Sequence, residues 1–145
     1  MRLAIVTIFG SILTLSLTAC GALPDSGPAK AVGERYFSAL KQAEYETIDT
    51  LYSAEFYVST PKDKLQRVRT KIREKLGEYQ SHRLFNTHSN RFSGLGKPAG
   101  DYTTLQYEVT YSKGTAKETI VVFAPRGGGD ALINGYDVRW DLSLD

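Results

Sequence analysis

A run of basic side chains between Pro61 and Leu76 is the part of this sequence whose residue types most clearly suggest binding chemistry. Seven lysines and arginines lie there against two acids. Arg67, Lys71 and Lys75 are spaced four residues apart, so on a helix they share one face, where like charges repel each other. Such a face suits an anionic partner, such as lipid head groups or an acidic neighbouring protein. The plainer alternative is a solvated helix surface.

Four aromatic residues form a second candidate site: Tyr107, Tyr111, Tyr136 and Trp140. Within each predicted strand their spacing is even, which places them on one face of a sheet. Such rings usually belong to the core or cover the outer face of a sheet. The alternative is that they line a ligand pocket or a protein-binding surface.

The two histidines, His82 and His88, have the same parity on a predicted strand. Six residues at about 3.3 Å each place them roughly 20 Å apart, too far to share a metal ion or a proton. We expect exposed polar side chains at both positions. The run Gly127-Gly128-Gly129 lies between two strand patterns rather than before a helix, so it indicates a hairpin tip and not a phosphate loop.

No residue pattern in the chain predicts catalysis. A serine nucleophile turn of the G-x-S-x-G type is absent, and a single cysteine excludes an intramolecular disulfide framework. The formal net charge of +2 is too small for a dedicated nucleic-acid-binding protein. Nine tyrosines and six phenylalanines argue against disorder. We therefore expect a folded protein that is not an enzyme and uses no cofactor and no metal.

The first twenty residues predict a secretory signal. Arg2 precedes an apolar stretch that runs from residue 3 to residue 17 and is too short for a permanent membrane span. The tetrad Leu17-Thr18-Ala19-Cys20 resembles the lipobox of bacterial lipoproteins. That resemblance implies cleavage between Ala19 and Cys20, and acyl chains on Cys20. The alternative is an ordinary secreted protein whose cysteine happens to follow the apolar run.

The lipobox resemblance also predicts location and domain boundaries. It implies a lipid-anchored protein of the bacterial cell envelope. Gly21 after the cysteine favours the periplasmic face of the outer membrane if the source is Gram-negative. We predict a signal peptide over 1–19, a lipidated tether over 20–29 and a single domain over 30–145.

Helical patterns come first in the predicted domain. Asp25 or Ser26 can cap a helix that Pro28 helps to start. A short helical stretch is expected over 44–54. A third helix is expected from Pro61, with Thr60 as its N-cap, to Gly77.

Strand patterns follow over 78–92, around 105–111, over 115–124 and over 131–142. The apolar run 120–123 suggests a central strand buried on both faces. Helices followed by an antiparallel meander predict an α+β fold, in which N-terminal helices pack on a curved antiparallel sheet of about four strands.

The order of these elements resembles the nuclear transport factor two-like, or cystatin-like, superfamily. The segments that carry the resemblance are YFSALK at 36–41, GDYTTLQY at 100–107, Glu118 and NGY at 134–136. It implies a curved sheet wrapped around a helix and enclosing a conical pocket. Related isomerases and dehydratases use an Asp or Tyr there, which makes Asp101 and Asp137 conceivable pocket acids, although their spacing does not select them.

Three functions remain open from the sequence. The first is a non-enzymatic, lipid-anchored envelope protein that binds a protein partner or a small apolar ligand. The second is a pocket enzyme of the isomerase or dehydratase type, which rests only on the resemblance. The third is a structural subunit of an envelope complex whose basic helix docks on an acidic neighbour.

Overall fold

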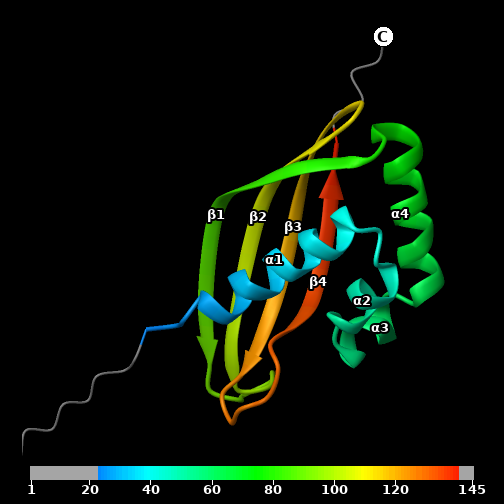
Figure 1. The fold of residues 1–145 in the computed structure, drawn as a ribbon. Coiled ribbons are helices and arrows are strands. Elements are labelled where there is room, and N and C mark those ends of the chain that lie inside the picture. Colours follow the sequence, from blue (N-terminus) through cyan, green and yellow to red (C-terminus); the bar gives the residue numbers. More distant parts are fainter. Residues whose placement is uncertain (1–22, 141–145) are drawn as a thin grey trace, which may run out of the picture.

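The computed structural model describes residues 23–140 and confirms the predicted α+β fold. Helices lie against one face and one edge of a curved, four-stranded antiparallel sheet (Figure 1). The predicted signal peptide and the predicted lipobox residues Ala19 and Cys20 lie outside the described residues. None of the helices in the described part of the chain is both long enough and apolar enough to span a membrane.

The helices are α1 (Gly27–Lys41), α2 (Tyr45–Thr50), α3 (Ala54–Ser59) and α4 (Lys62–Leu76). Two short helices therefore replace the single stretch expected over 44–54. Ser53 separates them because its backbone is extended and its hydroxyl accepts a hydrogen bond from the Phe56 amide, which starts α3. Pro61 is the N-cap of α4 rather than its first helical residue, and the helix ends at Gly77 as expected.

The start of α1 lies inside the segment predicted as a tether. The Asp25 carboxylate accepts a hydrogen bond from the Gly27 amide at 2.8 Å, and Pro28 occupies the first turn, where its missing N–H costs nothing. Ala29 is already buried against the core. The predicted tether over 20–29 thus overlaps the first three residues of α1.

The strands are β1 (Tyr79–Phe92), β2 (Gly100–Tyr111), β3 (Gly114–Pro125) and β4 (Leu132–Arg139). Each strand pairs with the next, so the sheet is a simple meander in the order β1-β2-β3-β4. The expectation of a strand buried on both faces is wrong. On β3, Ile120 and Val122 are fully buried, but Val121 and Phe123 remain partly exposed because no described helix covers the second face.

Two register shifts bend β1, one between Tyr79 and Ser81 and one between Leu84 and Asn86. Each bulge adds one residue to β1 and sharpens its local twist. Figure 1 shows the result: β1 curves strongly along its length while it stays paired with β2. The second bulge also reverses the parity of the strand, so His82 faces the helices whereas His88 is exposed. The prediction that the two histidines lie on the same face of the strand is therefore wrong.

The core lies between α1 and the inner face of the sheet, which is the face that α1 covers in Figure 1. A parallel bridge between Tyr52 and Ile133 ties the segment between α2 and α3 to β4. The Ile133 amide donates to the Leu51 carbonyl at 2.7 Å, and the Ser53 amide donates to the Ile133 carbonyl at 2.9 Å. These bonds hold the short helices at the β4 edge of the sheet.

Candidate functional site

A buried glutamate is the main polar feature of the interior. Glu118 on β3 is 0% exposed and accepts hydrogen bonds from two tyrosine hydroxyls. Tyr136 donates to Glu118 Oε2 at 2.9 Å, and Tyr111 donates to Glu118 Oε1. Tyr36 on α1 packs on Tyr136, with ring centroids 6.0 Å apart. We call Glu118, Tyr36, Tyr111 and Tyr136 the tyrosine–glutamate cluster.

Burial sets the ionisation of this cluster. Loss of solvent raises the pKa of the Glu118 carboxyl, and the two tyrosine hydrogen bonds oppose that rise only in part. Burial and the neighbouring carboxylate also raise the pKa of Tyr111 and of Tyr136, so both phenols stay protonated and keep donating. An acid with a raised pKa in the interior is a recognised feature of catalytic sites, and also of structural networks.

The four aromatic residues considered either as core or as pocket lining pack in or against the core. Tyr107 and Tyr111 are buried on the inner face of β2, and Tyr136 and Trp140 pack half-buried against the same core. The cavity beside the tyrosine–glutamate cluster, bounded by Tyr111 among others, measures about 30 Å³. Ligand sites for small organic molecules usually measure at least ~300 Å³. This cavity has room for one or two water molecules and is too small for an organic substrate.

Arg69 lines the small cavity beside the tyrosine–glutamate cluster. It lies on α4 but turns inward, with 14% of its side chain exposed, and pairs with Asp49 at 2.8 Å. Its Nε and Nη2 atoms are buried near the buried Tyr52 hydroxyl. Burial raises the pKa of Tyr52, and the charge of Arg69 together with a hydrogen bond to it opposes that rise only in part. Arg69 therefore stabilises the junction of α2 and α4 instead of contributing to a basic surface.

A groove of about 470 Å³ runs between α2 and α4. Most of its lining residues are charged or polar: Tyr45, Glu46, Asp49, Lys62, Gln66, Arg69, Thr70 and Arg73. Tyr45 is the one ring in it, with the guanidinium groups of Arg69 and Arg73 at 5.8 and 5.3 Å from its centroid. A groove of this composition does not suit the small apolar ligand considered from the sequence.

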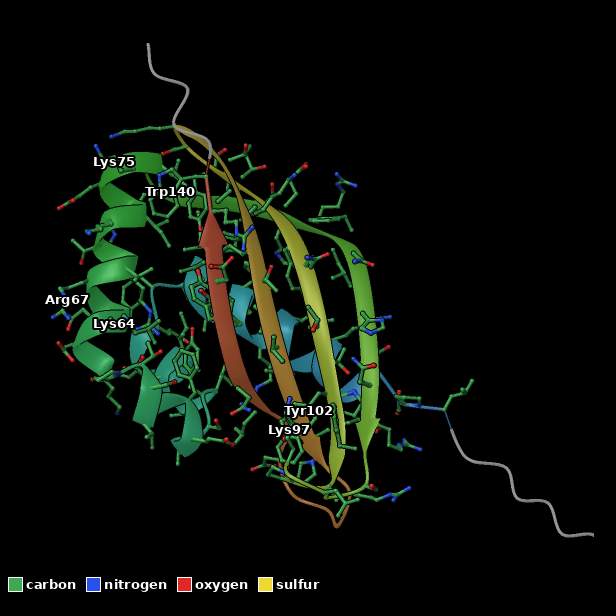
Figure 2. All side chains as sticks on the ribbon, turned by 180° about the vertical axis from the view of Figure 1, so that it is seen from behind. Lys64, Arg67, Lys75, Lys97, Tyr102 and Trp140 are labelled. Carbon is green, nitrogen blue, oxygen red and sulfur yellow. The ribbon has the colours of Figure 1, made fainter. Side chains whose placement is uncertain are left out.

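The predicted basic face is exposed, but its charges are not equivalent. Arg67 forms a surface ion pair with Asp63 at 2.6 Å, whereas Lys71 and Lys75 are exposed. Figure 2 shows Lys64, Arg67 and Lys75 pointing away from the body of the protein. Arg73 turns away from this face, since it pairs with Glu78 at 3.6 Å. Only part of the predicted charge is therefore available to an anionic partner.

An aromatic ladder crosses the uncovered face of the sheet. Phe92, Tyr102 and Phe123 come from three neighbouring strands, with successive ring centroids 5.2 and 4.7 Å apart. The Lys97 ammonium lies 5.0 Å from the Phe92 centroid and 5.7 Å from that of Tyr102. Figure 2 views this face, with Tyr102 and Lys97 at one end of the strands. We call these four residues the sheet-face cluster.

The histidines and the two conceivable pocket acids lie elsewhere. His82 stacks on Phe37 with centroids 4.0 Å apart, so the expectation that it is an exposed polar residue is wrong. Asp101 pairs with Arg91 at the end of the sheet, and Asp137 pairs with Arg139 on the outer face. Within residues 23–140, no group of three or more histidine, cysteine or acidic side chains is placed to hold a metal ion.

Sequence reasoning missed Glu118 as an interior residue, although a signal for it exists. Glu118 has the same parity as the buried residues Ala116, Ile120 and Val122 on β3. Strict alternation therefore places its carboxylate inside. The sheet-face cluster has a weaker signal, because its members come from different strands and meet only through the strand register.

Comparison with known proteins gives no match: no family model, no curated protein and no solved structure matches this chain.

Proposed function

We propose that this protein is a lipid-anchored binding protein of the bacterial cell envelope that recognises a protein partner and is not an enzyme. The lipobox resemblance at Cys20 supports the anchor. The sheet-face cluster is the single observation that supports a protein-binding surface. Aromatic residues flanked by a cation on an otherwise polar surface are the composition typical of protein interfaces.

The interior supports this proposal because the cavity beside the tyrosine–glutamate cluster is too small for an organic substrate. The residues that would form a conical pocket pack against one another, and the remaining cavity of about 30 Å³ admits no organic substrate. A protein of this kind recognises its partner through its surface. The open face of the sheet offers half-exposed rings there, whereas the outer face of α4 offers lysines and an arginine already paired with Asp63.

Site-specific photo-crosslinking in the native envelope tests the binding surface. Thr104 lies on the open face of β2, two residues after Tyr102, and is partly exposed. A photoreactive residue at Thr104 is expected to capture a discrete partner, and Tyr102→Ala is expected to weaken that capture. The same group at Lys113, on the turn between β2 and β3, is the matched control.

Position Lys71 separates the two candidate surfaces in the same experiment. Capture at Lys71 but not at Thr104 would assign binding to the basic face of α4 and overturn the sheet-face assignment. Lipidation is tested separately by the mass of the N-terminal peptide. The anchor proposal fails if that peptide carries no acyl chains, or if Cys20→Ser still fractionates with membranes.

The raised pKa of Glu118 favours one alternative, a pocket enzyme that uses this acid. Such an enzyme needs an open form of the protein, because the described cavity is too small for a substrate. Turnover abolished by Glu118→Gln would support the enzyme and refute our proposal.

A further inference from the structure

The N-terminal end of the described chain is fixed to one end of the sheet. Arg91 Nη2 donates to the Leu23 carbonyl at 3.3 Å, and the Asp25 amide donates to Asp101 Oδ2 at 3.3 Å. Arg91 in turn donates to both oxygens of Asp101, at 2.7 and 2.8 Å. Residues 23–25 are thereby tied to the ends of β1 and β2 before α1 begins.

Cys20 lies only three residues before Leu23. Three fully extended residues span at most about 10 Å. The acyl chains that the lipobox resemblance implies would therefore enter the bilayer within roughly 10 Å of the Leu23 backbone, plus the length of the cysteine side chain. This is a much shorter reach than a free tether over 20–29 would give. One end of the sheet is consequently held next to the lipid.

The same end of the molecule exposes apolar and basic groups. Leu23 is 86% exposed and Leu95, in the loop between β1 and β2, is 92% exposed. They are two of the four exposed large apolar side chains among residues 23–140. Figure 1 shows the β1–β2 loop and the β3–β4 loop at this one end of the sheet, and the second loop carries the exposed Arg126 beside an exposed Asp130.

We propose that this end of the sheet rests on the bilayer, with Leu95 and Leu23 at the level of the lipid head groups and Arg126 near the phosphates. The inference rests on the proposed lipid anchor, because the short distance from Cys20 is what brings this end to the membrane. Leucines enter the interfacial region readily, and basic side chains are attracted to anionic lipid. The occupant of this surface is the bilayer that holds the acyl chains.

The orientation narrows the kind of partner that the sheet-face cluster can bind. Lys97 of that cluster belongs to the same loop as Leu95, so the cluster lies just above the bilayer surface. A partner that reaches it is itself a membrane protein or is held close to the same membrane. A freely diffusing protein has less room to approach there than at the opposite end of the sheet.

Spin labelling of the lipidated full-length protein tests the orientation. The single native cysteine is consumed by the acyl group, so Leu95→Cys introduces one reactive thiol at an exposed position. Lys113→Cys, on the turn at the opposite end of the sheet, is the matched control. The labelled proteins are reconstituted into vesicles of phosphatidylethanolamine and phosphatidylglycerol, and the collision rate of each label with a water-soluble nickel complex is measured.

We expect reconstitution to lower the nickel collision rate several-fold at position 95 and to leave it unchanged at position 113. Equal accessibility of the two labels in acylated protein would overturn the orientation while leaving the anchor intact. An N-terminal peptide without acyl mass would overturn the anchor and the orientation together. A third label, at Thr104→Cys, distinguishes contact of lipid with the end of the sheet from contact with the face that carries the sheet-face cluster. Immersion there would show that the sheet-face cluster itself contacts lipid, which refutes its role as a protein-binding surface but not the orientation.

Discussion

The Tyr107 hydroxyl occupies the place where a side chain on Gly33 would begin. A Cβ atom built on Gly33 would lie 2.1 Å from the Tyr107 oxygen and 3.1 Å from its Cζ atom. Glycine in the middle of α1 is therefore required by close approach of the helix to β2, although it lowers helix propensity by about 1 kcal/mol relative to alanine. Among the described residues the buried hydroxyl has no hydrogen-bond partner, and burial raises the pKa of Tyr107 to about 12.

Gly33→Ala is expected to destabilise the protein by about 1–3 kcal/mol, because overpacking outweighs the gain in helix propensity. Tyr107→Phe removes a buried hydroxyl without a partner and is expected to be neutral or stabilising. The double variant should then recover most of the loss. Urea denaturation of the four proteins in a double-mutant cycle measures the coupling between the two positions. Additive effects would contradict the proposed steric contact.

We expect Glu118 to stabilise the folded protein through the hydrogen bonds that it accepts. Glu118→Leu leaves the Tyr111 and Tyr136 hydroxyls without their acceptor, at a cost of about 1–3 kcal/mol for each buried group. Glu118→Gln retains an acceptor oxygen, so its unfolding free energy at neutral pH should exceed that of Glu118→Leu by about 1–3 kcal/mol. Chemical denaturation checks the order. Equal stability of the two variants would show that the cluster contributes through packing alone.

The pH dependence of stability provides an independent test of the same residue. The pKa of Glu118 is raised in the folded state above its ordinary value of 4.5, so the folded protein binds this proton more tightly than the unfolded chain does. Glu118 therefore makes its full contribution to the free energy of unfolding below about pH 4.5. That contribution is lost as the pH rises towards and through the folded-state pKa. Relative to Glu118→Gln, the wild type should lose stability over that range. Parallel curves for the two proteins would refute the buried ionisation.

Two ion pairs of α4 are expected to differ in importance because they differ in burial. Arg69 and Asp49 are 14% and 28% exposed, and Asp49→Asn leaves a largely buried guanidinium without its counter-charge. We expect a loss of about 1–3 kcal/mol in unfolding free energy. Asp63→Asn is the matched control, since Arg67 and Asp63 are 66% and 67% exposed and solvent screens their pair. Thermal denaturation should show a clear shift for the first variant and none for the second.

Hydrogen exchange tests the attachment of residues 23–25 to the sheet. Asp101 accepts from Arg91 and from the Asp25 amide, and the Arg91 guanidinium lowers the pKa of the Asp101 carboxyl. Asp101→Asn should speed amide exchange at Asp25 and leave the β3 amides unchanged. Acidification should have the same local effect once Asp101 becomes protonated. Unchanged exchange at Asp25 would contradict the attachment and with it the short reach of the anchor.

Much of the fold is predictable because it depends on local signals. The helix end at Gly77 and the four strands follow from glycine, proline and the period of apolar residues. The bulges in β1 are not predictable in this way, because an extra residue at Phe85 has no local sequence signature and is fixed by pairing with β2. That one residue decides which histidine faces the core.

The candidate site was harder to predict for a related reason. Arg69 belongs to a helix that is basic on several sides, and only the position of Asp49 shows that its side chain turns inward. The sheet-face cluster depends on which residues of three strands stand opposite one another, as Tyr102 and Phe123 do. Neither relationship is local in sequence. The aromatic residues fill the interior because they meet one another across the strands.

The bridge between Tyr52 and Ile133 constrains the timing of folding during synthesis. Ser53 and Asn134, whose side chains also bond across this bridge at 2.8 Å, lie 81 positions apart. At about 5–20 residues per second, roughly 4–16 s pass between the production of the two segments. During that interval the residues of α1, α2 and α3 lack the strand that completes their packing. Any factor that shields them must therefore act before β4 is made.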